Sequence, residues 1–527
     1  MTPSALHKTL LTLACMAAAS TASAGTLTTW LGSGTSSNWS TANNWTTTPT
    51  TSGTFSLVYE GNRIRMTGTN NLAPPDAVKV DSILFASTVA SSTSNFTLAK
   101  SATTPALSLL NGATVTTIAA TSGTLSDSIS SNLEFGGTAT FNMGLRHNLL
   151  LSGTLSGGGA IVKQGDGDLN LSNTNNLTAL SIEQGVVQVN STSIAGITGL
   201  TVDIGSSGQT GTFRMANFGT TPVQTNIKFN LNGDANITPN NSNITFNAAN
   251  LNEAVAGVTT PVTLSLIGGF SDASKGTQTI NGAIQDNSAS GKVNVTIGTA
   301  TSENIWVLNG INTYTGSTTI QSNGKLLMNG SVAAGSTTTS YGYLGGSGTF
   351  GGAVIVSSGT LAPGGSSLGG VIVDTVGDLT MASLSLGSTA TTQLTITGTA
   401  ASLYDQIVAV GSGELTYGGN LALTLTGSQA YALNTTFNLF ENFVTRSGSF
   451  SSVTLFATDT PYDGLMFANV GGGIWETGPT GGPLNEYLRF EQSTGNLVAV
   501  PEPSTYAMAL AGLAYGGWQM YRRRKQA

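Results

Sequence analysis

The sequence of 527 residues has almost no cysteine and only two histidines. Its one cysteine, Cys15, lies in an apolar N-terminal segment, so the remaining chain can form no disulfide framework, cysteine-based zinc site or thiol nucleophile. His147 is the only histidine beyond residue 24. These absences leave few side chains for metal binding or acid–base catalysis.

Charge is also scarce, at 8% of residues against the roughly 25% of ordinary globular chains. Residues 25–500 hold 13 basic and 24 acidic residues. Phosphate binding needs clustered Lys and Arg, so no nucleic-acid partner is expected. An apolar content of 39% is nevertheless enough for burial, which argues against a charge-driven disordered chain.

What is abundant is glycine, with 68 residues, together with Ser, Thr and Asn. Apolar residues alternate with polar ones, as in 394–397 (Leu-Thr-Ile-Thr) and 421–426 (Leu-Ala-Leu-Thr-Leu-Thr). A period of two is typical of strands with one buried face, and Gly and Asn are typical of tight turns. The pattern predicts an all-β protein.

The N-terminus has three successive parts: basic residues, an apolar run from Leu10 to Ala19, and the small residues Ala22, Ser23 and Ala24. This is the layout of a secretory signal peptide, with cleavage expected after Ala24. A buried N-terminal helix is the alternative.

The C-terminus is also tripartite. Pro501, Glu502 and Pro503 precede an uncharged segment, 506–521, and then a basic cluster of Arg522, Arg523, Arg524 and Lys525. About 20 apolar residues usually span a bilayer, so this segment predicts a short, marginal transmembrane helix. The basic cluster would then stop at the cytoplasmic side.

This tail resembles the PEP-CTERM sorting signal, whose defining motif matches Pro501, Glu502 and Pro503. The resemblance implies a Gram-negative bacterium, transient contact with the inner membrane, recognition by an exosortase, and delivery to the cell surface or extracellular matrix. A simple tail anchor is the alternative.

Imperfect internal repeats lie between the two ends. In two copies an apolar strand is followed by a closing segment that runs from Gly to Asn, at 185–190 and 324–329. One such unit cannot bury its apolar face alone, so neighbouring units must stack. We therefore expect a right-handed parallel β-helix, a solenoid with β caps.

Residues 312–320 (Asn-Thr-Tyr-Thr-Gly-Ser-Thr-Thr-Ile) resemble the autotransporter-associated β-strand repeat, and 344–352 and 359–364 are similar to its continuation. Residues 159–165 also fit, although the Tyr-Thr-Gly core is missing at 177–179. The resemblance implies a β-helical, passenger-like stalk and no activity common to the family.

Three tryptophans, Trp30, Trp39 and Trp45, lie within sixteen residues of a Gly-, Ser- and Asn-rich segment. A cap on the repeat core is the preferred interpretation, because solenoids need capped ends. Stacking of sugars on exposed aromatic faces is the alternative.

Few residues are candidates for catalysis. They include Arg146 with His147, Asp166 with Asp168, and Tyr404 with Asp405. None recurs at the coil spacing, His147 is expected at the surface or in a turn, and the aspartates do not match the tandem calcium-binding nonapeptide. No enzymatic activity, metal or cofactor is expected.

The predicted organisation has five parts: a signal peptide (1–24), an N-terminal β cap (25–110), a β-helical region (111–400) with repeats near 153–190 and 305–365, a C-terminal β region (401–499) and the sorting signal (500–527). The predicted function is that of a surface or matrix adhesin-like protein of biofilms, with an exosortase and exopolysaccharide as partners. A polysaccharide-binding or polysaccharide-degrading β-helix is the alternative.

Overall fold

The structure is a computed structural model that describes residues 25–60, 66–72, 77–87, 95–100, 107–172, 177–190, 199–216, 223–239, 243–268, 276–299, 305–368, 370–427, 431–457, 460–479, 486–501 and 503–526. For residues 503–511 and 526 only the backbone is described. The chain divides into two units, Met1–Ser265 with Asn287–Gly291, and Leu266–Asp286 with Lys292–Ala527. Each unit is described separately.

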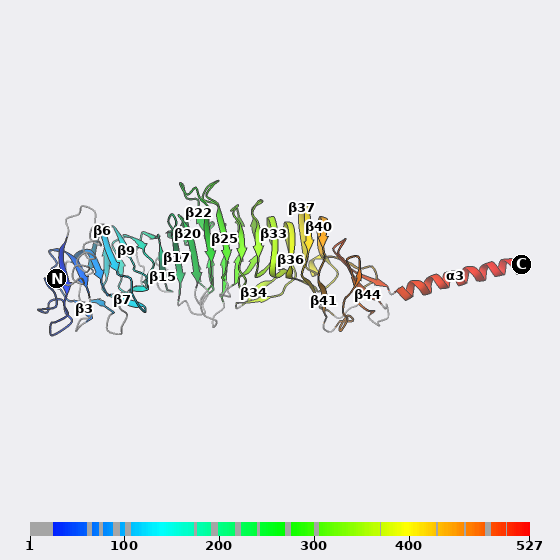
Figure 1. The fold of residues 1–527 in the computed structure, drawn as a ribbon, viewed down its shortest axis with the longest axis horizontal. Coiled ribbons are helices and arrows are strands. Elements are labelled where there is room, and N and C mark those ends of the chain that lie inside the picture. Colours follow the sequence, from blue (N-terminus) through cyan, green and yellow to red (C-terminus); the bar gives the residue numbers. More distant parts are fainter. Residues whose placement is uncertain are drawn as a thin grey trace. The chain divides into compact units, whose positions relative to one another are not determined.

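The first unit is built from two parallel sheets, and most successive strands alternate between them (Figure 1). The first sheet contains β1 (Thr26–Trp30), β2 (Thr54–Tyr59), β4 (Val78–Phe85), β6 (Leu107–Thr117), β9 (Thr138–Asn142), β12 (Ala160–Gln164), β14 (Ala179–Ile182), β16 (Thr201–Ile204), β19 (Lys228–Leu231) and β22 (Asn252–Glu253). Two short strands, β8 (Leu133–Phe135) and β11 (Leu155–Ser156), extend it from β6.

The second sheet of this unit is parallel as well. Its strands are β3 (Thr67–Asn70), β5 (Thr97–Lys100), β7 (Leu125–Ile129), β10 (His147–Leu151), β13 (Asp168–Leu171), β15 (Gly185–Val189), β17 (Thr210–Met215) and β20 (Asp234–Pro239). A further parallel pair is β18 (Val223–Thr225) with β21 (Ile244–Phe246), and β23 (Val262–Leu266) ends at the unit boundary. Alternation between two stacked sheets makes each pair of strands one coil.

The second unit stacks its strands on three faces. The first face contains β24 (Thr277–Ile280), β26 (Ile305–Leu308), β29 (Lys325–Met328), β32 (Tyr343–Gly346), the end of β33 (Thr349–Pro363), part of β36 (Asp378–Ile396), β38 (Asn420–Leu425) and β41 (Ser452–Ala457). The second begins with β25 (Val293–Ile297), β28 (Thr318–Ile320) and β31 (Thr338–Ser340), and the third with β27 (Ile311–Asn312) and β30 (Ser331–Val332).

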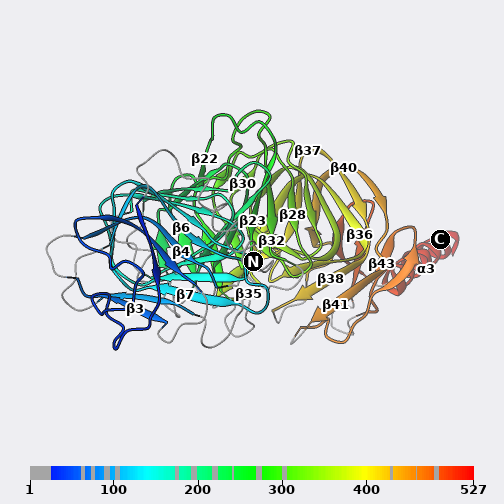
Figure 2. The ribbon, with the colours of Figure 1, turned by 60° about the vertical axis from the view of Figure 1, so that its left-hand side comes forward.

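The long strands β33 and β36, followed by β37 (Gln406–Tyr417) and β40 (Phe440–Gly448), bend across more than one face and lie side by side in chain order (Figure 1). Figure 2 shows β36, β38 and β41 beside one another. The short hairpin of β34 (Ser366–Leu368) and β35 (Val371–Val373) is antiparallel.

A five-stranded antiparallel sheet ends the body, in the order β39 (Thr436–Asn438), β45 (Asn496–Pro501), β44 (Glu486–Glu491), β43 (Ile474–Glu476) and β42 (Ala468–Gly471). The helix α3 (Pro503–Gln526) follows it. β45 lies in the interior of this sheet, between β39 and β44. The last strand of the body is therefore hydrogen-bonded on both sides.

The alternating burial of the strands explains the stacking. In β10 and β36, for example, inward apolar residues alternate with more exposed ones, and burial of the inward set is what drives coils together. The predicted all-β fold with parallel, solenoid-like stacking is confirmed. The right-handedness of the coil stays a prediction, as do the domain boundaries. Parallel pairing continues past residue 400, since Thr392 in β36 pairs with Leu421 in β38.

The repeat segments occupy equivalent places. Asp168 in the first copy pairs with Val186, and Ile305 in the second pairs with Lys325, so in each copy the opening strand stacks directly on the closing one. Gly316 of the repeat has no room for a side chain, because a Cβ there would lie 2.2 Å from the carbonyl oxygen of Val293. The repetition therefore serves the stacking of coils.

Candidate functional site

The predicted sorting motif begins inside the terminal sheet. Pro501 pairs with Glu486 and Val500 with Tyr487 across β45 and β44. On the other side, the N–H of Ala499 donates to the carbonyl oxygen of Thr435 (3.0 Å), and its own carbonyl oxygen accepts from Asn434 (2.7 Å). No spacer separates the folded body from the first motif residue.

The other two motif residues lie beyond the strand. Glu502 is outside the described residues, and Pro503 is the first residue of α3. Proline is favoured at the first position of a helix, because its fixed φ suits the helix and its missing N–H has no partner there anyway. The motif therefore lies at the change from strand to helix.

The side chains of α3 pair one turn apart. The guanidinium of Arg522 lies 4.6 Å from the ring of Trp518, and the ammonium of Lys525 lies 5.1 Å from the ring of Tyr521. Basic residues in the last turn also interact favourably with the helix dipole. Leu513, Trp518 and Met520 are exposed on this helix. The predicted basic cluster therefore lies in the last turns of α3.

The prediction of a transmembrane helix is corrected. Within the described part of the chain, no helix is both long and apolar enough to cross a membrane. The physical reason is composition, since Gly512, Gly516, Gly517 and Gln519 lower the hydropathy of α3 between its apolar residues.

A buried acid, which sequence reasoning missed, lies beside the motif. Glu486, opposite Pro501, is 1% exposed, and its Oε1 accepts a hydrogen bond from the hydroxyl of Tyr462 (3.2 Å). Its Oε2 has no hydrogen-bond partner. Burial raises the pKa of Tyr462 well above its usual range, and the nearby Glu486 raises that pKa further. The hydroxyl of Tyr462 therefore stays protonated and can donate to Glu486.

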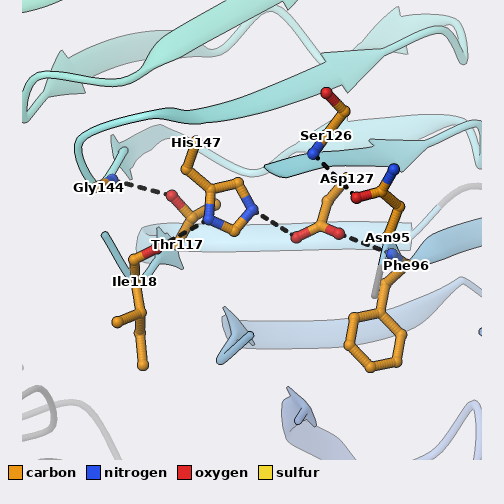
Figure 3. A network of polar contacts seen from close by, with 8 residues as sticks. All are labelled: Asn95, Phe96, Thr117, Ile118, Ser126, Asp127, Gly144 and His147. Atoms are coloured by element: carbon orange, nitrogen blue, oxygen red, sulfur yellow. Dashed lines mark hydrogen bonds and ion pairs between the residues drawn. The ribbon is translucent and has the colours of Figure 1, made fainter. Parts of the chain in front are cut away.

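His147, predicted at the surface or in a turn, is instead fully buried in β10 (Figure 3). Its Nδ1 lies 2.8 Å from the carbonyl oxygen of Ile118, and its Nε2 lies 2.7 Å from Oδ2 of Asp127. The other oxygen of Asp127 accepts the backbone N–H of Phe96 (2.6 Å). The earlier expectation is wrong because strand alternation places His147 on the inward face of β10, in line with Leu149 and Leu151.

The contacts of this pair define its protons. A backbone carbonyl only accepts, so Nδ1 of His147 carries a hydrogen toward Ile118. The contact between Nε2 and Asp127 then needs one more proton, held by either side chain. The buried pair is therefore an internal cross-link between β7 and β10. Arg146, the neighbour in sequence, is exposed and does not join it.

Lys163 in β12 is a second inward-facing ionisable residue. Its Nζ donates to three backbone carbonyl oxygens, those of Gln164 (2.9 Å), Gly165 (2.7 Å) and Gln184 (3.0 Å). Burial lowers the pKa of Lys163 to about 8, against the attraction of Asp168 and Asp166. Lys163 therefore links two successive coils through hydrogen bonds to their backbone carbonyl groups.

The remaining sequence candidates have structural partners. Asp166 accepts from the side chain of Gln184 (2.7 Å), and Asp168 forms an ion pair with Arg214 (2.9 Å). Asp405 is 1% exposed and accepts the backbone N–H groups of Gly377 (2.8 Å) and Thr395 (2.7 Å), while burial raises its pKa to about 7. Over the described ranges no group of three or more His, Cys, Asp or Glu could hold a metal ion.

The three tryptophans near the N-terminus are buried. Trp45 contacts both Trp30 and Trp39 edge-on, with ring centroids 5.1 Å apart in each pair, and Tyr59 packs 5.6 Å from Trp45. Their ring faces are therefore occupied by one another, and sugar stacking on them is not supported. The cap function stays a prediction.

The signal-peptide cleavage residues Ala22 and Ala24 lie outside the described residues. The first strand, β1, starts at Thr26, two residues after Ala24.

Comparison with known proteins agrees with the C-terminal geometry. The PEP-CTERM protein-sorting motif matches residues 499–525. This match does not extend to 153–190 or 305–365, so the likeness of those segments to the autotransporter-associated repeat stays a prediction. No curated protein and no solved structure matches the chain. The chain carries a PEP-CTERM sorting motif, which indicates an exported protein that is processed by an exosortase and located at the cell surface or outside the cell.

Proposed function

We propose that this chain is a non-enzymatic structural protein of the bacterial surface or extracellular matrix, which binds exopolysaccharide through the polar outer faces of its coils. The observation that carries the proposal is the direct connection of a sorting motif, at 499–525, to the last strand of the body, in the antiparallel sheet that follows the parallel coils in the chain. A solenoid offers a long, regular surface, and the sorting motif accounts for its delivery outside the cell.

The outer surface supports a binding role. Asn309 lies between Asn281 and Asn329, and their side-chain amides form a ladder with contacts of 2.9 Å and 3.1 Å. Elsewhere the outer positions carry Thr and Ser, whose hydroxyls both donate and accept. Such a surface can hydrogen-bond a polymer rich in hydroxyl groups without attracting ions.

The tail would contact the inner membrane transiently while the exosortase acts. The exposed side chains of Leu513, Trp518 and Met520 provide apolar area on α3, and the following basic cluster would lie among anionic headgroups. This contact needs no helix that spans the bilayer.

The matrix role is tested by comparing wild-type cells with a strain that lacks this protein. The amount of extracellular polysaccharide retained on washed cells should fall in the deletion strain and recover when the chain is restored. Unchanged retention would contradict a matrix role. The purified chain should also bind the polymer without shortening it, measured by size-exclusion chromatography. A fall in polymer mass would instead support the polysaccharide-degrading alternative.

A further inference from the structure

A groove of about 280 Å³ lies on the first unit, where β7, β10, β13 and β15 run side by side. Its lining side chains include Asn148, Asn170 and Gln188, together with Leu150. The register places Leu150, Asn170 and Gln188 in one row across the strands, while Asn148, two residues before Leu150 on β10, pairs with Asp168 in the adjacent row. A linear molecule that lies across the strands would therefore meet one of these side chains on each successive strand.

The amides of this groove are not used by the fold. Among the described residues, the side chains of Asn148, Asn170 and Gln188 make no hydrogen bond to the protein. Comparable outer amides elsewhere do have partners, as Asn230 has in Asp203 (2.6 Å) and Asn236 has in Thr212 (3.1 Å). Each free amide offers both donors and an acceptor. In this groove the amide donors and acceptors are therefore available to a ligand.

The groove offers no free charge to a ligand. Asp127, which also borders it, is 1% exposed and its carboxylate is bound to His147 and the backbone N–H of Phe96. Asp168 pairs in register with Asn148, and Arg214 with Gln188, but these two ions are paired with each other at 2.9 Å. An anionic polymer would therefore find no unpaired cation among the described lining residues.

An extended peptide is a poor fit for this place. Peptides that add to a sheet bind along an open edge, where backbone groups are unpaired. Here β7, β10, β13 and β15 each pair with a strand on both sides, so only side chains face the groove. Hydroxyl groups of sugars match the free amides, and Leu150, which is 36% exposed, can contact an apolar sugar face.

We propose that this groove binds a linear, uncharged polysaccharide, which lies across β7, β10, β13 and β15 and hydrogen-bonds to Asn148, Asn170 and Gln188. This inference rests on the proposed function and assigns the polymer contact to one site.

The test uses the full chain and the extracellular polysaccharide of the producing strain, separated by anion exchange into neutral and acidic fractions. The variant Asn170→Ala/Gln188→Ala removes two free amides from half-exposed, outward positions. The matched control, Asn230→Ala/Asn236→Ala, removes two outer amides that already have partners in Asp203 and Thr212. Unchanged circular dichroism and melting temperature would show that both variants fold.

We expect the wild type to bind the neutral fraction in preference to the acidic one, with an affinity that barely changes when sodium chloride is raised, because no charge is neutralised. The groove variant should bind about thirtyfold more weakly, because two hydrogen bonds of roughly 1 kcal/mol each are lost, whereas the control should bind like the wild type.

Equal binding by the wild type and the groove variant, a preference for the acidic fraction, or no binding of the neutral fraction would overturn the groove assignment. If binding is equal while the deletion strain still loses its matrix, only the groove assignment fails. If the deletion strain retains all its polysaccharide, the proposed function fails as well.

Discussion

The backbone nitrogen of Gly25 donates a hydrogen bond to Oδ2 of Asp81, a residue 56 positions further along the chain. Oδ1 of the same carboxylate accepts from the hydroxyl of Ser56 (2.7 Å). Gly25 is the residue that would become the N-terminus if the signal peptide is cleaved after Ala24. Cleavage would convert this amide into an ammonium group and the hydrogen bond into an ion pair.

The first prediction concerns this contact. Replacing Asp81 by Asn should destabilise the processed protein by about 1 kcal/mol, the upper range of a partly exposed ion pair, and the unprocessed precursor by less. Urea unfolding of both forms measures the difference. Asp203→Asn, which alters a carboxylate bonded to Asn230, serves as control and should affect both forms equally. Equal losses with Asp81→Asn would argue against an N-terminus at Gly25.

The second prediction concerns the buried pair of Asp127 and His147. Replacing His147 by Ala should lower the free energy of unfolding by about 3–5 kcal/mol, because it leaves the buried carboxylate of Asp127 without its partner. Replacing both residues by Leu should restore much of that loss, since no unpaired group remains. Thermal melting measures both variants. A double variant as unstable as the single one would contradict the cross-link described here.

The third prediction follows from the pKa of Lys163, which burial lowers to about 8. Between pH 8 and about 10.5 the unfolded lysine is protonated more than the folded one, so unfolding takes up a proton and stability rises with pH. The rise from this group is at most about 3.5 kcal/mol, from roughly 1.4 kcal/mol for each of the 2.5 pKa units between 8 and 10.5. Lys163→Met should remove that part of the pH dependence, whereas Lys79→Met, an exposed position, should not. If the stability of the Lys163→Met protein rose with pH as steeply as that of the wild type, a buried, destabilised ammonium at Lys163 would be contradicted.

The parallel coils could be predicted from sequence because their signals are local. Alternation such as Leu394–Ile396, closing glycines and repeated asparagines each lie within one strand or turn. The pairing of His147 with Asp127 could not, because it depends on the register between coils, which brings together residues 20 positions apart.

The C-terminal tail likewise has features that the sequence predicts and features that only the structure shows. The tripartite tail was recognisable from residue types alone, and its match at 499–525 agrees. That the motif starts within an interior strand depends on distant partners, Thr435 and Glu486, and so required the structure. The low apolar content of α3 was visible in the sequence. The prediction that this helix spans the membrane was nevertheless wrong.

The fourth prediction concerns the missing spacer. Because β45 pairs with β44 as far as Pro501 and is hydrogen-bonded on its other side as far as Ala499, the exosortase must reach a motif held against the sheet. Inserting Gly-Ser-Gly-Ser between Val500 and Pro501 should therefore speed removal of the tail severalfold, measured by pulse–chase labelling. The same insertion between Gly472 and Gly473, in the turn between β42 and β43, is the control. Equal rates for the insertion at the motif and the wild type would show that the sheet does not limit access.

The motif at the end of the terminal sheet should direct removal of the tail and release of the body from the cell. This is measured by mass spectrometry of protein from cells and medium, comparing the wild type with Pro501→Ala/Glu502→Ala. We expect wild-type protein outside the cell that begins at Gly25 and ends near Val500, and a variant that remains cell-associated with its tail intact. An intact C-terminus in both proteins, retained in the membrane fraction, would contradict the claim.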